Sequence, residues 1–363
     1  MKTGKSLIEL ATEVQRQQDS KRDYLADTRA LEMVPVAMSL TGAEPTKAET
    51  VALAGINGEP LALRRQAHAQ IASRVQIPKA YYDRMLDAAP ELLASNVNHW
   101  FQTQPERRMV RTLDGTVRAF LSDRYRALDN FDLLQAALPV LKGMNTQFAS
   151  AEVTEPHLYL KVIFPELETV IKGSKQVGDV VQAGLVISNS EIGMSSLRVE
   201  PFFHRLICTN GMISNYATRK YHVGRGHDVE DQVAEILRDE TREQLDRGFW
   251  MKIQDVIRTA VSRDVIEAQV QRFENATQQR IEGNPVKVVE VARKSLALPE
   301  SMQGDILKNL IDWGDLSQWG LANAITRVAN EAPDYEDATA LERAGGKVIE
   351  LSQREWSSIS TAS

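Results

Sequence analysis

Residues 157 to 164, with the sequence His-Leu-Tyr-Leu-Lys-Val-Ile-Phe, are the first of three consecutive segments that decide the fold. The other two are Val180 to Ser188 and Ser195 to Ile207. All three are rich in branched or aromatic residues and are separated by Gly, Asn and Ser, which is typical of strands joined by turns. They predict a mainly antiparallel sheet in the middle of the chain.

Two hairpins are predicted before this sheet. Asp114-Gly115 lies between two alternating segments, and Asn57-Gly58 lies between two others. Both dipeptides readily adopt the positive φ angles that a tight two-residue turn requires. We therefore expect two more pairs of antiparallel strands in the first third of the chain.

Helices are expected around these hairpins. Residues 5–32 have apolar residues at helical spacing, and two short helices are predicted over residues 64–75 and 78–86, with Pro78 in the first turn of the second. Two short adjacent helices invite a helix-turn-helix interpretation. The usual glycine turn is absent, however, and a packed pair without a DNA role is favoured.

The pattern changes at residue 228, where an apolar stripe at helical spacing begins. Residues 228–363 contain 25 acidic and 16 basic residues, a net charge of -9, whereas residues 1–227 contain 24 acidic and 27 basic residues, a net charge of +3. We predict an α+β protein with two parts. Residues 1–227 form a mixed core with a basic, strand-rich middle, and residues 228–363 form an acidic, mainly helical region packed on that core.

Composition excludes several classes of protein. Hydrophobic residues make up 43% and charged residues 25% of the 363 residues, as in ordinary globular proteins. Cys208 is the single cysteine, which excludes an intrachain disulfide framework and a zinc cluster built from cysteines of one chain. No signal-type segment and no apolar run of about 20 residues is present, so we expect a cytoplasmic protein without a membrane partner.

The basic residues concentrate in two stretches that also contain aromatic residues. The first provides Arg118, Arg124, Tyr125 and Arg126, and the second provides Arg205, Arg219, Lys220 and Tyr221. Arginines can neutralise phosphates while aromatic rings stack on bases, so both stretches are candidate contacts for single-stranded nucleic acid. On a strand, Arg124 and Arg126 would project from one face.

A simpler interpretation remains open for both stretches. The arginines of the first also fit ion pairs with Asp114, Asp123 and Asp129 on a solvated sheet edge. In the second, Phe202 and Phe203 would point to opposite faces of a strand, so at least one of them belongs to the core.

No pattern of catalytic residues stands out. Cys208 lies in an apolar run four residues after His204, which favours a buried structural cysteine over a nucleophile. His222 and His227 could join Asp228 at a metal ion, but three ligand-capable residues in a turn are more often only hydrated. Nucleotide-binding glycine fingerprints are also absent. We therefore assign no catalytic residue, no metal site and no cofactor, and the sequence leaves open whether the protein is an enzyme.

A set of short motifs resembles the phage/plasmid-like family called domain of unknown function 932. The resemblance spans roughly residues 60 to 330 and implies a setting in phages, prophages and plasmids, without catalytic residues to transfer. Its motifs are Ile77-Pro78-Lys79-Ala80-Tyr81-Tyr82, Asn98-His99-Trp100, the segment from Arg118 to Arg126, the segment from Arg205 to Gly211 and the segment from Trp319 to Thr326.

These observations predict a nucleic-acid-binding protein of mobile elements. Single-stranded DNA is the expected partner, bound or annealed without nucleotide hydrolysis, and the chain is expected to assemble into rings or filaments. Two alternatives remain: a protein-interaction module that modulates host defence or replication, and a metal-dependent nuclease that uses the aspartates near the first basic stretch.

Overall fold

The computed structural model describes residues 1–36, 50–214, 222–223 and 239–363. Antiparallel sheets lie in the first and middle parts and the last part is helical, which confirms the predicted α+β class. No helix in these ranges combines the length and the apolar character that a membrane span needs.

The chain forms two compact units. Unit 1 contains residues 1–12, 128–190 and 195–363, and unit 2 contains residues 13–127 and 191–194. This division differs from the boundary that we predicted at residue 227, because the strands after residue 128 and the helices after residue 239 belong to one unit. The change of charge at residue 228 therefore accompanies a change from strands to helices within unit 1.

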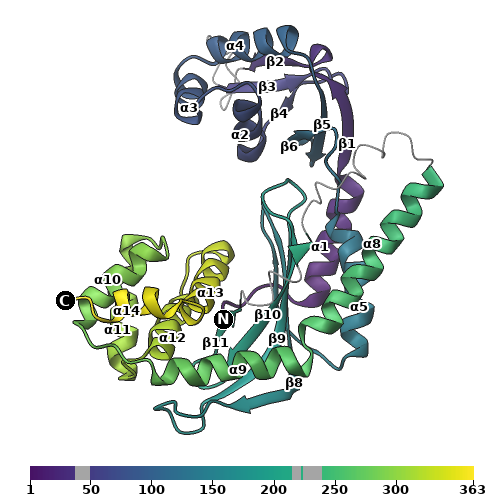
Figure 1. Ribbon diagram of the computed structural model, residues 1–363. Helices are drawn as coiled ribbons and strands as arrows, with labels where there is room; N and C mark the ends of the chain where they lie inside the picture. The colour runs from purple at the N-terminus through teal and green to yellow at the C-terminus, as the bar shows by residue number, and fades with distance from the viewer. Residues whose placement is uncertain (37–49, 215–221, 224–238) are drawn as a thin grey trace. The chain divides into compact units, whose positions relative to one another are not determined.

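In its described residues, unit 2 combines two small antiparallel sheets with α2, α3, α4 and the part of helix α1 (Leu7–Ser20) that follows residue 12. The strand orders are β1-β5-β6 and β2-β3-β4. The elements are β1 (Arg22–Asp27), η1 (Thr28–Ala30), β2 (Glu32–Val36), β3 (Thr50–Ala54), β4 (Leu61–Ala62), α2 (Arg65–Arg74), α3 (Lys79–Ala88), α4 (Pro90–Thr103), β5 (Arg107–Leu113) and β6 (Thr116–Ser122) (Figure 1).

The core of unit 2 lies between its helices and one face of the β5–β6 hairpin. Phe101 of α4 stacks on Phe120 of β6 with 5.7 Å between ring centroids, and Val110 of β5 is buried beside them. His68 of α2 shares a 2.9 Å hydrogen bond at Nδ1 with the Tyr82 hydroxyl of α3. The two short helices are thus a packed pair, as expected.

The two predicted hairpins form, but only one has the predicted turn. Asp114 and Gly115 both have positive φ angles, 53° and 70°, and Leu113 pairs with Thr116, which confirms the two-residue turn. In the other hairpin Leu53 pairs with Leu61, so residues 54–60 form a longer connection than the tight turn we predicted.

The helix predicted over residues 5–32 is confirmed only in its first part. Helix α1 (Leu7–Ser20) ends before β1, which pairs with the distant strand β5; Arg22, for example, faces Thr112. A strand that depends on a distant partner leaves little local signal, which is why helical spacing alone extended the prediction too far.

Unit 1 is built on an antiparallel sheet with the order β11-β10-β9-β8-β7, and β12 also pairs with β10. The three segments that decided the fold are β8, β9 and β10. The strands are β7 (Gln147–Val153), β8 (Leu158–Val170), β9 (Val180–Asn189), β10 (Leu197–Arg205), β11 (Asn210–Ile213) and β12 (His222–Val223).

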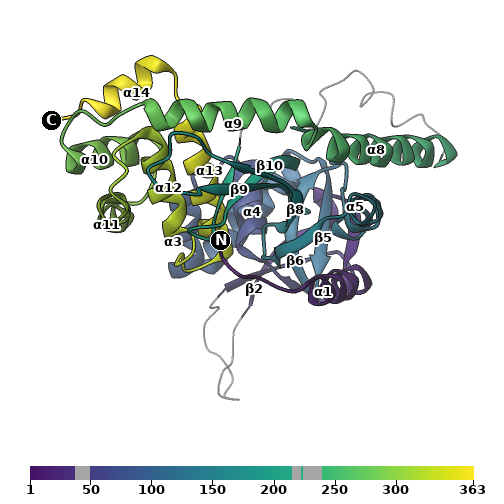
Figure 2. The same cartoon turned by 90° about the horizontal axis from the view of Figure 1, so that it is seen from below.

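Helices cover both faces of this sheet. Figure 1 shows α12 and α13 on one side and α5 and α8 on the other, and Figure 2 shows α9 continuing from α8 toward α10 and α14. The helices are α5 (Asn130–Gly143), α8 (Asp239–Ala260), α9 (Arg263–Gln278), α10 (Pro285–Ser295), η2 (Glu300–Met302), α11 (Gln303–Trp313), α12 (Gln318–Val328), α13 (Tyr335–Ile349) and α14 (Gln353–Ser360).

Candidate functional site

Arg205, a predicted phosphate contact, is buried in unit 1 and paired with Asp179. Its Nε and Nη2 atoms donate to the two carboxylate oxygens of Asp179 at 2.5 and 2.7 Å, and the side chain is only 6% exposed. The guanidinium carbon lies 5.5 Å from the ring centroid of Trp313 and 5.6 Å from that of Trp319. This charge is satisfied inside the protein, so the expected phosphate contact at Arg205 is not available in this structure.

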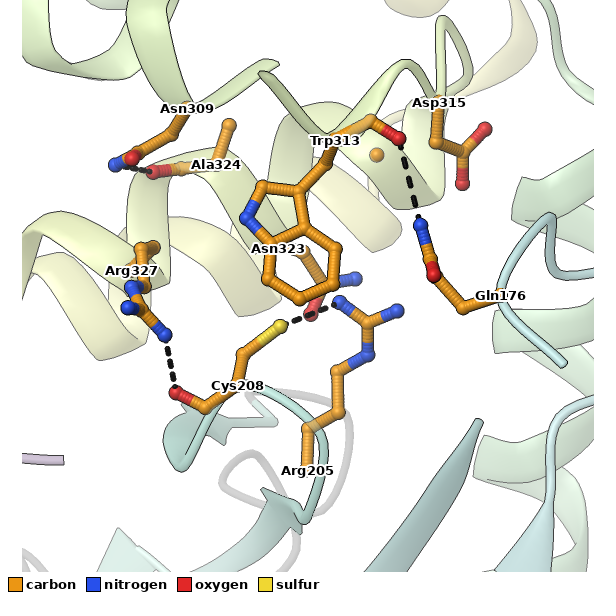
Figure 3. Close-up of a pocket in the computed structure, with 10 residues that line it drawn as sticks. Gln176, Arg205, Cys208, Asn309, Trp313, Asp315, Asn323, Ala324 and Arg327 are labelled. Carbon is orange, nitrogen blue, oxygen red and sulfur yellow. Dashed lines mark hydrogen bonds between the residues drawn. The ribbon is translucent and has the colours of Figure 1, made fainter. Parts of the chain in front are cut away.

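Cys208 lies beside this pair. The Nη1 group of Arg205 donates to Cys208 Sγ at 3.2 Å, and Arg327 donates to the Cys208 carbonyl oxygen at 2.8 Å (Figure 3). Burial raises the pKa of the Cys208 thiol, against the opposing influence of Arg205. A buried thiol of this kind stays protonated and weakly reactive at neutral pH, as the sequence suggested.

The same region joins two of the sequence motifs. Asn210, at the start of β11, donates to Asn323 Oδ1 at 3.3 Å and to the Thr326 hydroxyl, both on α12. Asn323 in turn donates to the Trp319 carbonyl oxygen at 2.8 Å. The motif segments 205–211 and 319–326 are therefore packed against each other and attach α12 to the sheet.

A small pocket at this junction is lined by Gln176, Arg205, Cys208, Trp313 and Asn323, among others (Figure 3). Its free volume is about 10 Å³, which is the space of about one water molecule. The geometry stabilises the packing of β10, β11 and α12, and the pocket is too small to hold a substrate.

A second group of buried charges lies between the sheet and α13. Lys161 and Glu200 are on one face of the sheet, because both face Val186 of β9 from its two sides. Lys161 Nζ donates to Glu342 at 2.5 Å, and Arg343 Nη2 donates to Glu200 at 2.6 Å. Burial lowers the pKa of Lys161, while the attraction of Glu342 opposes that shift. These pairs fix α13 on the sheet.

One further carboxylate extends this group. Glu336 accepts hydrogen bonds from the Tyr159 hydroxyl at 2.7 Å and from the Thr154 hydroxyl at 2.6 Å, and it lies 3.0 Å from His157 Nδ1. Burial acts to raise the pKa of Glu336, but the combined hydrogen bonds leave it below its ordinary value. The carboxylate is therefore held ionised at neutral pH.

Arg118, another predicted phosphate contact, is buried in unit 2. Its Nη1 donates to Glu191 at 2.6 Å, and its exposed fraction is 5%. The neighbouring Arg111 donates to Asp23 at 2.9 Å and to the Glu191 carbonyl oxygen at 2.8 Å. The face of β5 and β6 that carries these arginines is covered by residues 191–194, so Arg118 is a structural ion-pair partner rather than the exposed contact that we expected.

Tyr125 is also buried. It is 9% exposed and packs with Ala119, Leu121 and Ile192. Its ring cannot stack on a base in this conformation, which corrects the role we predicted. Arg219, Lys220 and Tyr221 lie outside the described residues.

Arg124 and Arg126 remain on the surface. Both follow the end of β6 at Ser122, so they are not alternate residues of a strand as we expected, although both are exposed. Arg108 pairs with Ser122, and this register places the exposed Arg107 at the same end of the hairpin. We call Arg107, Arg124 and Arg126 the hairpin-end arginines.

The acidic residues near this end are largely occupied. Asp27 binds Arg29 at 2.8 Å, and Glu106 binds Arg74 at 2.9 Å and also Arg108. Asp123 is half-buried. Arg107 faces Asp27 across the β1–β5 pair, and its charge contributes to lowering the pKa of that carboxyl. Within the described parts of the chain, the guanidinium groups of Arg107 and Arg124 form no hydrogen bond and no salt bridge within 4 Å.

The predicted metal candidates do not gather into a site. Asp114 binds Arg16 at 2.8 Å and accepts a hydrogen bond from Ser20 at 2.7 Å. Among the residues that the structure describes, no three His, Cys, Asp or Glu side chains are grouped so that they could hold a metal ion. His227 and Asp228 lie outside those residues, as does the side chain of His222.

The sequence analysis missed the acidic partners of the buried basic residues. Asp179, Glu191 and Glu342 each pair with a cation that is at most 6% exposed. One signal was present in the sequence: Lys161 is an isolated charge within a strongly apolar strand. Such a charge needs a buried partner, because an unpaired one is very costly in the core.

Comparison with known proteins adds no relative. No family model, no curated protein and no solved structure matches the chain. The resemblance to the phage/plasmid-like family therefore stays a prediction based on the motifs alone.

Proposed function

We propose that the protein binds nucleic acid through the hairpin-end arginines, and that single-stranded DNA is bound or annealed without nucleotide hydrolysis. The observation that supports this function is the exposure of Arg107 and Arg124 at one end of the β5–β6 hairpin, where neither guanidinium group forms a salt bridge in the described chain and Arg107 has only the electrostatic attraction of Asp27 opposite it. Exposed arginines that lie close together bind phosphates and release counterions from the nucleic acid.

The proposal is narrower than the prediction from sequence. Arg118 and Arg205 are paired internally and Tyr125 is packed, so phosphate contacts rather than base stacking provide the binding energy in unit 2. Contacts of this type carry little sequence information, so we expect binding that depends strongly on salt and weakly on sequence.

The experiment is fluorescence anisotropy with labelled single-stranded and duplex DNA over a salt series. The double variant Arg107→Glu with Arg124→Glu should weaken binding at least tenfold and reduce the salt slope by about two, one for each phosphate that the variant leaves unneutralised. Arg263→Glu is the matched control, because its side chain is 89% exposed on α9 in unit 1 and should not affect binding.

The outcomes separate the candidate functions. Tight, salt-dependent binding of single strands that is abolished in the double variant would support the proposal, and an annealing assay would follow. Preference for duplex DNA would retain the surface but remove annealing. Absence of binding at low salt would contradict the proposal and favour a protein partner, to be sought by a pull-down from the host.

A further inference from the structure

The dipeptide Asn-Gly occurs at two places in the chain, and the fold puts them in opposite environments. Asn57-Gly58 lies in the connection between β3 and β4, where residues 57–60 are all exposed. Asn210-Gly211 begins β11 and is buried, with Asn210 only 1% exposed. The two positions therefore differ in structure while sharing the same local chemistry.

Asn-Gly is the dipeptide most prone to an internal reaction of the asparagine side chain. The backbone nitrogen of the glycine attacks the side-chain amide carbon, ammonia leaves, and a succinimide ring forms. Water then opens the ring at either carbonyl, which gives aspartate or isoaspartate. Glycine favours the attack because it has no Cβ to obstruct its nitrogen and because its backbone adopts many conformations. The rate in a folded protein depends on whether the two groups can approach each other.

The Asn57 side chain and the Gly58 backbone nitrogen are free to meet. Within the described parts of the chain, neither group has a hydrogen-bond partner. Gly58 has a φ angle of 101°, and a Cβ added there would have nothing within 4 Å. The tight turn expected from the sequence would have held both residues between paired strands, but the observed connection, residues 54–60, is longer. The longer connection exposes the dipeptide.

The start of this connection is fixed to the rest of unit 2. Gly55 has a φ angle of 91° and passes so close to η1 that an added Cβ would lie 2.0 Å from the Ala30 carbonyl oxygen. Ile56 is partly buried against the core of unit 2. The exposed part is thus limited to residues 57–60, so the two reacting groups can meet without unfolding of unit 2.

Asn210 is held away from the same reaction. Its Nδ2 donates to Asn323 Oδ1 at 3.3 Å and to the Thr326 hydroxyl of α12. Gly211 is packed so closely that an added Cβ would lie 2.2 Å from the ring of Phe202. Moving the Asn210 amide carbon toward the Gly211 nitrogen would break these hydrogen bonds and distort β11. The reaction at Asn210 therefore requires local unfolding of unit 1.

We propose that Asn57 is a site of spontaneous covalent modification, at which the native protein converts asparagine into aspartate and isoaspartate. Water is the one co-reactant, and the released ammonia carries away the side-chain nitrogen. Both products add a negative charge to unit 2, and isoaspartate also adds a carbon atom to the main chain. The residue pairs that join β3 to β4 are Ala52 with Ala62 and Leu53 with Leu61, so a longer main chain between them should loosen β4. The modified fraction rises with the age of the molecule.

Peptide mapping by mass spectrometry tests the proposal, after incubation of the full chain at mildly alkaline pH, both native and unfolded in guanidinium chloride. In the unfolded chain Asn57 and Asn210 should convert at similar rates, because the local sequence alone then acts. In the native chain Asn57 should convert at least about tenfold faster than Asn210, because only the reaction at Asn210 needs unfolding. An isoaspartate-specific methyltransferase should label the Asn57 peptide, because direct hydrolysis of the amide would give aspartate alone.

A glycine substitution tests the internal attack. Gly58→Ala should slow the conversion of Asn57 at least about tenfold, because a Cβ obstructs the attacking nitrogen and restricts the backbone. Gly248→Ala is the matched control, because an added Cβ there also has nothing within 4 Å, and it should leave the rate at Asn57 unchanged.

Three results would overturn the proposal. They are conversion of native Asn57 as slow as that of Asn210, formation of aspartate without isoaspartate, and an unchanged rate in Gly58→Ala. Arg107→Glu with Arg124→Glu should not alter the rate at Asn57, so this modification stands or falls independently of the nucleic-acid surface.

Discussion

Lys161 and Glu342 are both fully buried, and each neutralises the other. Lys161 Nζ also lies 4.5 Å from the ring centroid of Tyr335, whereas the second carboxylate oxygen of Glu342 has no hydrogen-bond partner. A buried ion pair of this kind costs desolvation energy that its attraction only partly recovers. Its main consequence is that neither partner can be removed alone.

We predict that Lys161→Met lowers the free energy of unfolding by about 3 to 5 kcal/mol, because Glu342 is left as an unpaired buried charge. The double variant Lys161→Met with Glu342→Leu should recover most of that stability, since it replaces the pair with apolar side chains of similar volume. Urea unfolding of the two single variants and the double variant checks this. A double variant as unstable as the sum of the singles would contradict it.

His68 makes unit 2 sensitive to acid. Burial, followed by the nearby charge of Lys79, lowers the pKa of His68 to about 4. Its folded pKa is below the unfolded value of about 6.5, so the unfolded chain binds more protons between these values. Stability from His68 is complete above about pH 6.5 and is lost as the pH falls toward about 4.

We expect the step from pH 7.5 to pH 5 to cost about 2 kcal/mol of unfolding free energy at this residue. His68→Gln, which keeps a polar group near the Tyr82 hydroxyl without titrating, should lack that part of the pH dependence. Denaturant unfolding of both proteins at the two pH values measures the difference. An identical pH dependence in the variant would show that His68 does not control it.

Helix α13 contacts the sheet and α12 through two consecutive glycines. A Cβ atom at Gly346 would lie 1.9 Å from the Ile213 carbonyl oxygen of β11, and one at Gly345 would lie 2.2 Å from Thr326 Cγ2 of α12. The first contact is with backbone, which cannot move aside as a flexible side chain can. The close approach of α13 that aligns Glu342 and Arg343 with the sheet therefore requires glycine.

Gly346→Ala should destabilise the protein by about 2 kcal/mol, because overpacking outweighs the better helix propensity of alanine. Gly248→Ala in α8 is the matched control, because nothing lies within 4 Å of the added Cβ. This variant should gain only the helix propensity of alanine and become more stable by up to about 1 kcal/mol. Thermal unfolding of both variants tests whether the two substitutions have opposite signs.

Local patterns predicted the elements better than their partners. Asp114-Gly115 was sufficient to place the β5–β6 hairpin, because the turn conformation depends on those two residues themselves. Strand β1 was missed because its pairing with β5 is non-local. The burial of two predicted phosphate contacts has the same cause. Arg118 is buried against Glu191 and Arg205 against Asp179. Neither acidic residue lies in the basic stretch that contains its partner, so the local sequence did not reveal the pairing.

At the scale of the whole molecule, the chain contributes to unit 2 twice. It passes through unit 2 over residues 13–127 and contributes residues 191–194 again, between β9 and β10. In this segment, Glu191 accepts a hydrogen bond from Arg118, and Ile192 packs with Ala119, Leu121 and Tyr125. Unit 2 is therefore incomplete without four residues that follow a strand of unit 1.

We predict that Glu191→Ala destabilises unit 2 by about 3 to 5 kcal/mol, because Arg118 is left buried without its carboxylate. Met194→Ala in the same segment, residues 191–194, should change the free energy of unfolding by no more than about 0.5 kcal/mol, because the Met194 side chain is 50% exposed. Amide hydrogen exchange measures the stability of each unit separately. In Glu191→Ala, the amides of β5 and β6 should lose protection from exchange, while those of β8 and β9 should keep theirs. If the amides of both units lost protection equally, the two units would unfold together as one cooperative unit, and the prediction would be wrong.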